Sequence, residues 1–290
     1  AGPEPGMMQQ WSGAAGPRAG VGRPRPAAQG CDAMQHGSAG HTTAASGAPR
    51  PRAAWVDCAK GISICLVVLW HAVGTAFLVN NLLILVRMPL FFFLAGFFAA
   101  KIIATPWPHL LRTRTLNFYY IYLVWMTLFF ILVVTVREAM HGHLPSPATY
   151  LIHLVVPLDY LWFLFTLALL FAFARLVRGI PAAAVIGALL LVYAVSVSDG
   201  RWEPITYATR LARLPLFFML GTLSFAQVDA WSRASRAFWP LSAALFAGAS
   251  LMVMEGGLGH VAAATLATSA LGILAVCQFC QQMQATALGR

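Results

Sequence analysis

Charged residues are scarce in this chain. Only 10% of its 290 residues are Asp, Glu, Lys or Arg, and just nine of these are acidic. Because a soluble domain carries about 25% charged residues, this composition excludes an ordinary water-soluble protein. Hydrophobic residues make up 59% of the chain, and several apolar runs approach the roughly 20 residues that a helix needs to cross a bilayer.

The sequence also lacks the motifs of many soluble enzymes. It contains no P-loop, G-x-S-x-G, H-E-x-x-H or dinucleotide-binding fingerprint. Its five cysteines form no secreted disulfide framework, and Cys277 and Cys280 make a lone C-x-x-C inside an apolar run. Since no second pair and no histidine cluster accompany them, we expect no metal site.

Residues 1–53 contain no long apolar run and are rich in Gly, Ala, Pro and Arg. Such a segment cannot bury enough apolar surface to offset its ordering entropy, so we predict a disordered, low-complexity region. It has no apolar core of signal-peptide length. A disordered tail and translated sequence upstream of a start such as Met34 both remain open.

Residues 54–290 are predicted to form an all-α, polytopic membrane bundle of about eight transmembrane helices. The predicted spans are 59–79, 82–103, 116–136, 158–177, 180–198, 209–227, 237–254 and 261–281. The segment 150–157 is too short to span and is expected to be interfacial or re-entrant.

The net charge of +10 reflects topology and does not indicate nucleic acid. Six of the nineteen Lys and Arg residues precede or open the first span, and most others lie in short loops on the same side. This bias predicts a cytoplasmic N-terminus. We therefore expect membrane lipid around the chain and no nucleic-acid partner, and oligomeric state is not indicated.

His71 lies inside a strongly apolar stretch, eleven positions after Lys60. Eleven helical steps return to within about 20° of the start and rise roughly 16 Å, so the two side chains share one helix face. An ionisable group at membrane depth usually has a function, and a neutral imidazole can act as a general base. The alternative is a histidine that is only hydrogen-bonded between packed helices.

Other polar residues leave two interpretations each. Asp57 can pair with Lys60 across one helical turn, either as a simple cap or as part of a phosphate site. Arg87 either snorkels outward or points inward and stabilises an anion. Arg112 and Arg114 belong to a basic loop that positive-inside charge explains, with a phosphate site as the second possibility. Arg210 and Arg213 pose the same choice at the other membrane surface, where a saccharide is the candidate ligand.

Four segments carry a family resemblance. Trp55-Val-Asp57-Cys-Ala-Lys60, continued by Val68-Leu-Trp-His71, resembles the first helix of the acyltransferase family 3 membrane proteins, in particular the fucose 4-O-acetylase-like branch. The family has a basic residue, ten intervening positions and then His. The segments 87–98, 161–164 and 213–221 resemble later blocks. Trp70 stands where Gly commonly precedes the His, and Arg87 where the branch usually has His.

The resemblance implies transfer of an acyl group, usually acetyl, from acyl-CoA to a carbohydrate hydroxyl. In that reading His71 activates the nucleophile. Lys60, with Arg112 and Arg114, would meet the phosphates of CoA, and Arg87 and Trp162 would line the substrate cavity. The imidazole would then face an enclosed polar chamber.

Two further expectations accompany the resemblance. The final residues look like the lead-in to a terminal helix, so we expect one or two more helices after Arg290. The main alternative function is a membrane transporter that uses His71 and Arg87 as a proton or substrate relay, although we see no repeated halves in the sequence. A non-catalytic membrane assembly partner is a third.

Overall fold

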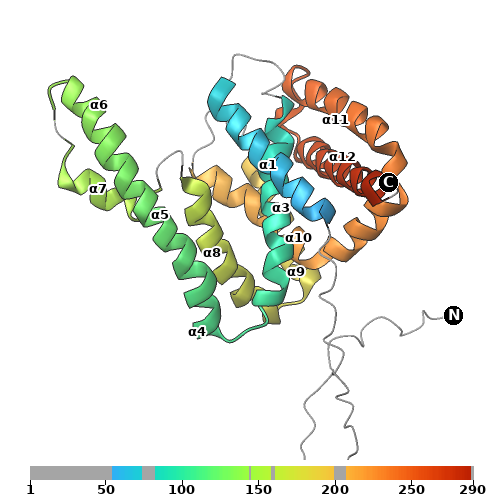
Figure 1. Cartoon of the computed structure of the whole chain (residues 1–290), viewed down its shortest axis with the longest axis horizontal. Coiled ribbons are helices and arrows are strands. Elements are labelled where there is room, and N and C mark those ends of the chain that lie inside the picture. Colours follow the sequence, from blue (N-terminus) through green and yellow to red (C-terminus); the bar gives the residue numbers. More distant parts are fainter. Residues whose placement is uncertain (1–53, 74–81, 144, 158–160, 199–206, 289–290) are drawn as a thin grey trace, which may run out of the picture. The chain divides into compact units, whose positions relative to one another are not determined.

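A computed structural model describes residues 54–73, 82–143, 145–157, 161–198 and 207–288 (Figure 1). Within these ranges the chain is helical and has no strand. The predicted disordered region, 1–53, lies outside the described residues, as does the end of the first predicted span.

The helices follow one another along the chain (Figure 1). They are α1 (Ala54–Val73), α3 (Ile84–Ile102), α4 (Trp107–Leu110), η2 (Leu111–Thr115), α5 (Leu116–Phe129), η3 (Phe130–Val134), α6 (Thr135–Met140), α7 (Pro147–His153), α8 (Trp162–Leu176), η4 (Val177–Gly179), α9 (Ala182–Ser198), α10 (Tyr207–Ala234), η5 (Arg236–Phe238), α11 (Trp239–Met254), η6 (Leu258–His260) and α12 (Ala262–Leu288). The segments η2 and η3 are π-helical, whereas η4, η5 and η6 are 3₁₀-helical.

Among the described residues, seven helical stretches are long and apolar enough to cross a membrane. The prediction of an all-α, polytopic membrane bundle is therefore confirmed. The remaining predicted span, 180–198, corresponds to α9, which is apolar but has only 17 residues. The third span was predicted too short, because α4 to α6 form one continuous helical stretch of 34 residues, Trp107–Met140.

The first span begins earlier than predicted. It was expected at 59–79, whereas α1 begins at Ala54. Asp57 then falls in the first turn and His71 in the last described turn. Both positions suit the helix dipole, which favours negative charge at the amino end and positive charge at the carboxyl end.

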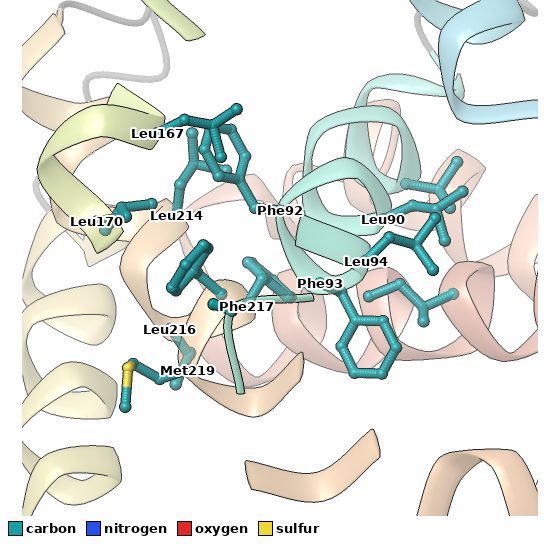
Figure 2. Close-up of a cluster of buried hydrophobic side chains, with 14 of the residues drawn as sticks. Leu90, Phe92, Phe93, Leu94, Leu167, Leu170, Leu214, Leu216, Phe217 and Met219 are labelled. Carbon is teal, nitrogen blue, oxygen red and sulfur yellow. The ribbon is translucent and has the colours of Figure 1, made fainter. Parts of the chain in front are cut away.

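Helix α3 is the centre of the bundle. It packs against α1, α8, α10 and α12, and its buried residues point in several directions around the helix axis. A helix that is hydrophobic all round is typical of the core of a bundle. Figure 2 shows the part of this core where three helices meet, with Leu90, Phe92, Phe93 and Leu94 of α3, Leu167 and Leu170 of α8, and Leu214, Leu216, Phe217 and Met219 of α10.

The segment 150–157, expected to be interfacial or re-entrant, lies along α5. Its helix, α7, begins at Pro147 after Ser146, whose hydroxyl accepts a hydrogen bond from the amide of Ala148. Tyr119 donates to the carbonyl of Leu154 over 3.0 Å, and Tyr122 donates to the carbonyl of His153. These tyrosines satisfy backbone carbonyls that the end of a short helix leaves open.

The backbones of α3 and α10 touch at two glycines. A Cβ atom on Gly96 would collide with the carbonyl oxygen of Phe218, and one on Gly221 would collide with that of Phe93. The hydroxyl of Thr222 lies 3.1 Å from the carbonyl oxygen of Gly96, to which it donates across the same contact. Small residues let membrane helices approach closely enough for such packing.

We expect Gly96→Ala and Gly221→Ala to destabilise the protein. Each added methyl group meets backbone and not a movable side chain, so the two helices must separate, at a cost of about 1–3 kcal/mol or more. The thermal midpoint of the purified protein in detergent measures the effect.

Gly187→Ala in α9 and Gly248→Ala in α11 are the matched controls, because a Cβ there meets nothing within 4 Å. Alanine at an open helical position is neutral or stabilises by about 0.5–1 kcal/mol. Equal midpoints for the two pairs of variants would contradict the close α3–α10 contact.

Candidate functional site

Two contacts show how α1 and α3 run side by side. Near the start of α1, the amino group of Lys60 lies 3.9 Å from the ring centre of Phe98, near the end of α3. Near the end of α1, the ring of Trp70 lies 4.3 Å from the guanidinium of Arg87, near the start of α3. The two helices are therefore antiparallel. We call the two ends of the bundle the Lys60 end and the His71 end.

At the Lys60 end, the predicted pair of Asp57 and Lys60 is present. The amino group of Lys60 lies 3.1 Å from a carboxylate oxygen of Asp57, and both side chains remain partly exposed, at 56% for Asp57 and 40% for Lys60. One face of the ammonium group meets the ring of Phe98. The cation is thus held in place but still reachable by an anion at this surface.

Arg112 and Arg114 lie on η2, the π-helical turn that leads into α5. Arg112 is exposed, and Arg114 lies 5.9 Å from the ring of Phe171 on α8. Single π-helical turns inside α-helices are rare and are frequently found at functional sites. However, η2 packs on α8 whereas Lys60 packs on α3, so these contacts do not bring the three predicted phosphate ligands together.

Arg87 points into the bundle, which decides between its two predicted orientations. Its side chain is 3% exposed and is stacked over the ring of Trp70. A buried guanidinium beside an indole gains a cation–π interaction that is strongest where water is excluded. Sequence reasoning did not find this contact, although Trp70 and Arg87 are both positions at which the chain departs from the pattern that it otherwise resembles.

Trp162 was predicted to line a cavity, and the structure places it in the core. Its ring is stacked on Phe92, with 6.0 Å between ring centres, and the guanidinium of Arg210 lies 4.7 Å from the centre of the Trp162 ring. Arg213, one turn further along α10, donates to the carbonyl of Ser196. Trp162 is therefore a support for Arg210 at the level of the middle of α3. The helical spacing of Arg210 and Arg213 was the only signal of this arrangement in the sequence.

His71 lies in the last described turn of α1 and is exposed. The helix is unbroken between Lys60 and His71, so the shared face and the rise of roughly 16 Å hold. The expectation of an enclosed chamber is wrong for the described residues, because α1 packs on α3 and α12 through the side that carries Trp55, Val56, Ala59 and Ser63. In the part of the chain that the structure describes, the imidazole of His71 is exposed.

We expect Asp57→Ala to change the free energy of unfolding by less than about 1 kcal/mol, since an exposed ion pair across one helical turn contributes little. Arg87→Ala is the comparison, because it removes a buried side chain from a packed contact and should lower the thermal midpoint clearly. If the two variants lost the same amount of stability, the Asp57–Lys60 pair would contribute as much to the fold as the buried Arg87 side chain.

Comparison with known proteins adds to this geometry. The acyltransferase domain model of family 3 matches residues 53–287, which include every residue considered above. No curated protein and no solved structure matches the chain. The resemblance to the fucose 4-O-acetylase-like branch stays a prediction. The chain belongs to the acyltransferase family 3 membrane proteins.

Proposed function

We propose that the chain is an integral membrane O-acyltransferase that moves an acetyl group from acetyl-CoA to a hydroxyl group of a cell-surface or secreted carbohydrate. One observation supports this proposal above the others. The unbroken helix α1 holds an accessible cation, Lys60, near one end and an accessible imidazole, His71, near the other. The family match supports acyl transfer in general.

The proposed reaction needs one proton acceptor and one site for negative charge. The neutral imidazole of His71 takes the proton of the acceptor hydroxyl as its oxygen attacks the thioester carbonyl. The carbon–sulfur bond then breaks, the ester forms, and the departing thiolate receives the proton from the imidazolium. Arg87, at the same end of the bundle, is the proposed group that stabilises the developing oxyanion.

The donor is proposed to enter from the Lys60 end. Its phosphates would be attracted by Lys60, Arg112 and Arg114, since charge-assisted hydrogen bonds to phosphate are strong. Trp162 and its partner Arg210 are proposed to border the acceptor, to whose hydroxyl groups the guanidinium of Arg210 can donate hydrogen bonds. The charge bias of the loops supports a bacterial inner membrane location with the N-terminus and the Lys60 end in the cytoplasm.

We expect His71→Ala to abolish acetyl transfer while leaving expression and acetyl-CoA binding unchanged, because only the proton acceptor is removed. Losses of about 10²–10⁴-fold are typical when a general base is removed. His141→Ala is the control, since this exposed histidine follows the end of α6 and its ring is hydrogen-bonded to the carbonyl of Arg137 in that helix.

The measurement is transfer of labelled acetyl groups to glycan acceptors by the purified protein in nanodiscs. Normal transfer by His71→Ala would remove the assignment of the base. Proton-coupled flux of a substrate into liposomes, without consumption of acetyl-CoA, would instead support a transporter.

Lys60→Ala is expected to raise the KM for acetyl-CoA about tenfold with a smaller change in kcat, because a charge-assisted contact to phosphate contributes roughly 1.4 kcal/mol of binding. Lys60→Arg should restore most of the affinity. Lys101→Ala provides the control, as this exposed lysine lies in the last turn of α3 at the same end of the bundle. An unchanged KM in Lys60→Ala would leave Lys60 with the role of a helix cap.

A further inference from the structure

A cavity of about 580 Å³ lies where α10 turns into η5, apart from all residues assigned above. Its lining combines two arginines and one carboxylate with small apolar residues. The lining residues are Asp229, Ala230, Arg233, Ala234, Arg236 and Ala237. Small-molecule sites commonly have volumes of 300–1,000 Å³, so the cavity is large enough for a nucleotide.

The carboxylate of the cavity is held in place by two hydrogen bonds, one of them from a neighbouring helix. The carboxylate of Asp229 accepts a hydrogen bond from Arg233 over 2.7 Å through one oxygen and from Gln281 of α12 over 2.8 Å through the other. Ser235, which lies between the lining residues Ala234 and Arg236, is also held, since its hydroxyl accepts a hydrogen bond of 2.8 Å from the buried Gln278. A site that is already ordered loses little entropy when a ligand binds.

The chemistry of the lining favours a phosphate ester that also carries hydroxyl or amino groups. Arg233 and Arg236 outnumber the single carboxylate of Asp229, so the lining has a net positive charge. Guanidinium groups match phosphate oxygens in two-pronged hydrogen bonds. Each oxygen of Asp229 accepts one bond and has a second lone pair, which a ribose hydroxyl or an adenine amino group can use.

The cavity lies at the Lys60 end of the bundle. Helices α3 and α10 run parallel, because Phe93 meets Gly221 and Phe97 meets Phe225 four residues further along each helix. Phe225 is also stacked on Trp55 near the start of α1, at 5.4 Å between ring centres. Asp229 follows one turn later, beyond the level at which Lys60 lies over Phe98.

We infer that this cavity binds the phosphate-bearing nucleotide end of the acyl donor, so that the donor's acyl arm extends from the α10–η5 turn toward α1. This inference rests on the proposed function, because it requires a nucleotide-containing donor. It assigns Arg233 and Arg236 as donor-binding residues and Asp229 as the residue that positions Arg233.

The test compares the double variant Arg233→Gln/Arg236→Gln with the wild type in nanodiscs. We expect the KM for acetyl-CoA to rise at least tenfold, with kcat within about twofold, and binding of adenosine 3′,5′-bisphosphate to weaken to a similar extent. Arg178→Gln is the matched control. This exposed arginine donates a hydrogen bond to the carbonyl of Ala104 and does not line the cavity.

Arg236→Gln alone provides a second variant that keeps the Asp229–Arg233 pair, in case the double variant does not fold. It should raise the KM about threefold or more, and an unchanged KM together with unchanged bisphosphate binding overturns the inference. An equal rise in Arg178→Gln also overturns it, because the effect would then come from general surface charge.

Failure of the site and failure of the proposed function give different results. If the wild-type protein transfers acetyl groups and the variants have an unchanged KM, the proposed function stands and the proposed donor site is wrong. If the wild-type protein neither binds acetyl-CoA nor transfers acetyl groups, both the proposed function and the proposed donor site are wrong. Nanodiscs containing phosphatidylglycerol distinguish a lipid phosphate from a nucleotide phosphate. If native mass spectrometry shows that the double variant retains less lipid while its nucleotide binding is unchanged, the cavity binds a lipid phosphate and the donor assignment is overturned.

Discussion

The close contact between the backbones of α3 and α10 at Gly96 and Gly221 is the constraint on which the rest of the bundle depends. In a membrane, helices gain little from leaving lipid, so they associate through close packing and hydrogen bonds. Here two glycines and the hydroxyl of Thr222 supply both. With α3 held in this way, α1, α8 and α12 pack on its remaining sides, and their polar residues are fixed relative to one another.

The resulting arrangement separates two kinds of chemistry along the membrane normal. Cations that remain accessible gather at the Lys60 end, where Lys60 and Arg112 are exposed or half-exposed. At the His71 end, Arg87 and Arg210 lie against tryptophan rings within the bundle. The proposed function would use such a division, because the charged end of an acyl-CoA donor would stay in water while its thioester reached the proposed base.

The contact between Trp70 and Arg87 connects two residues that look like separate irregularities in the sequence. A small residue before the histidine would leave space at this place, and the indole of Trp70 fills it. The guanidinium of Arg87 then has an aromatic face to lie on, at 4.3 Å. The contact stabilises both residues, since an arginine without a partner is costly at membrane depth and an indole gains from a cation over its face.

Much of this was readable from the amino-acid sequence. Apolar runs predicted the all-α membrane bundle, and eight predicted spans correspond to eight apolar helices. The spacing of Asp57 and Lys60 predicted their pairing, because residues three apart on a helix must be neighbours. Local geometry also placed Lys60 and His71 on one face of α1. These features depend only on hydropathy and on the period of a single helix.

Only the tertiary structure decided the contacts between helices. The sequence left the orientation of Arg87 open, did not show which side chains meet Trp162, and gave no sign of the cavity beside Asp229 and Arg233. It also led to an enclosed chamber around His71, whereas the described residues leave that ring exposed. The physical reason is that hydropathy shows which residues leave water but not which neighbour each one meets. Every side of a membrane helix is apolar, so the rotation and depth of one helix relative to the next are set by packing alone.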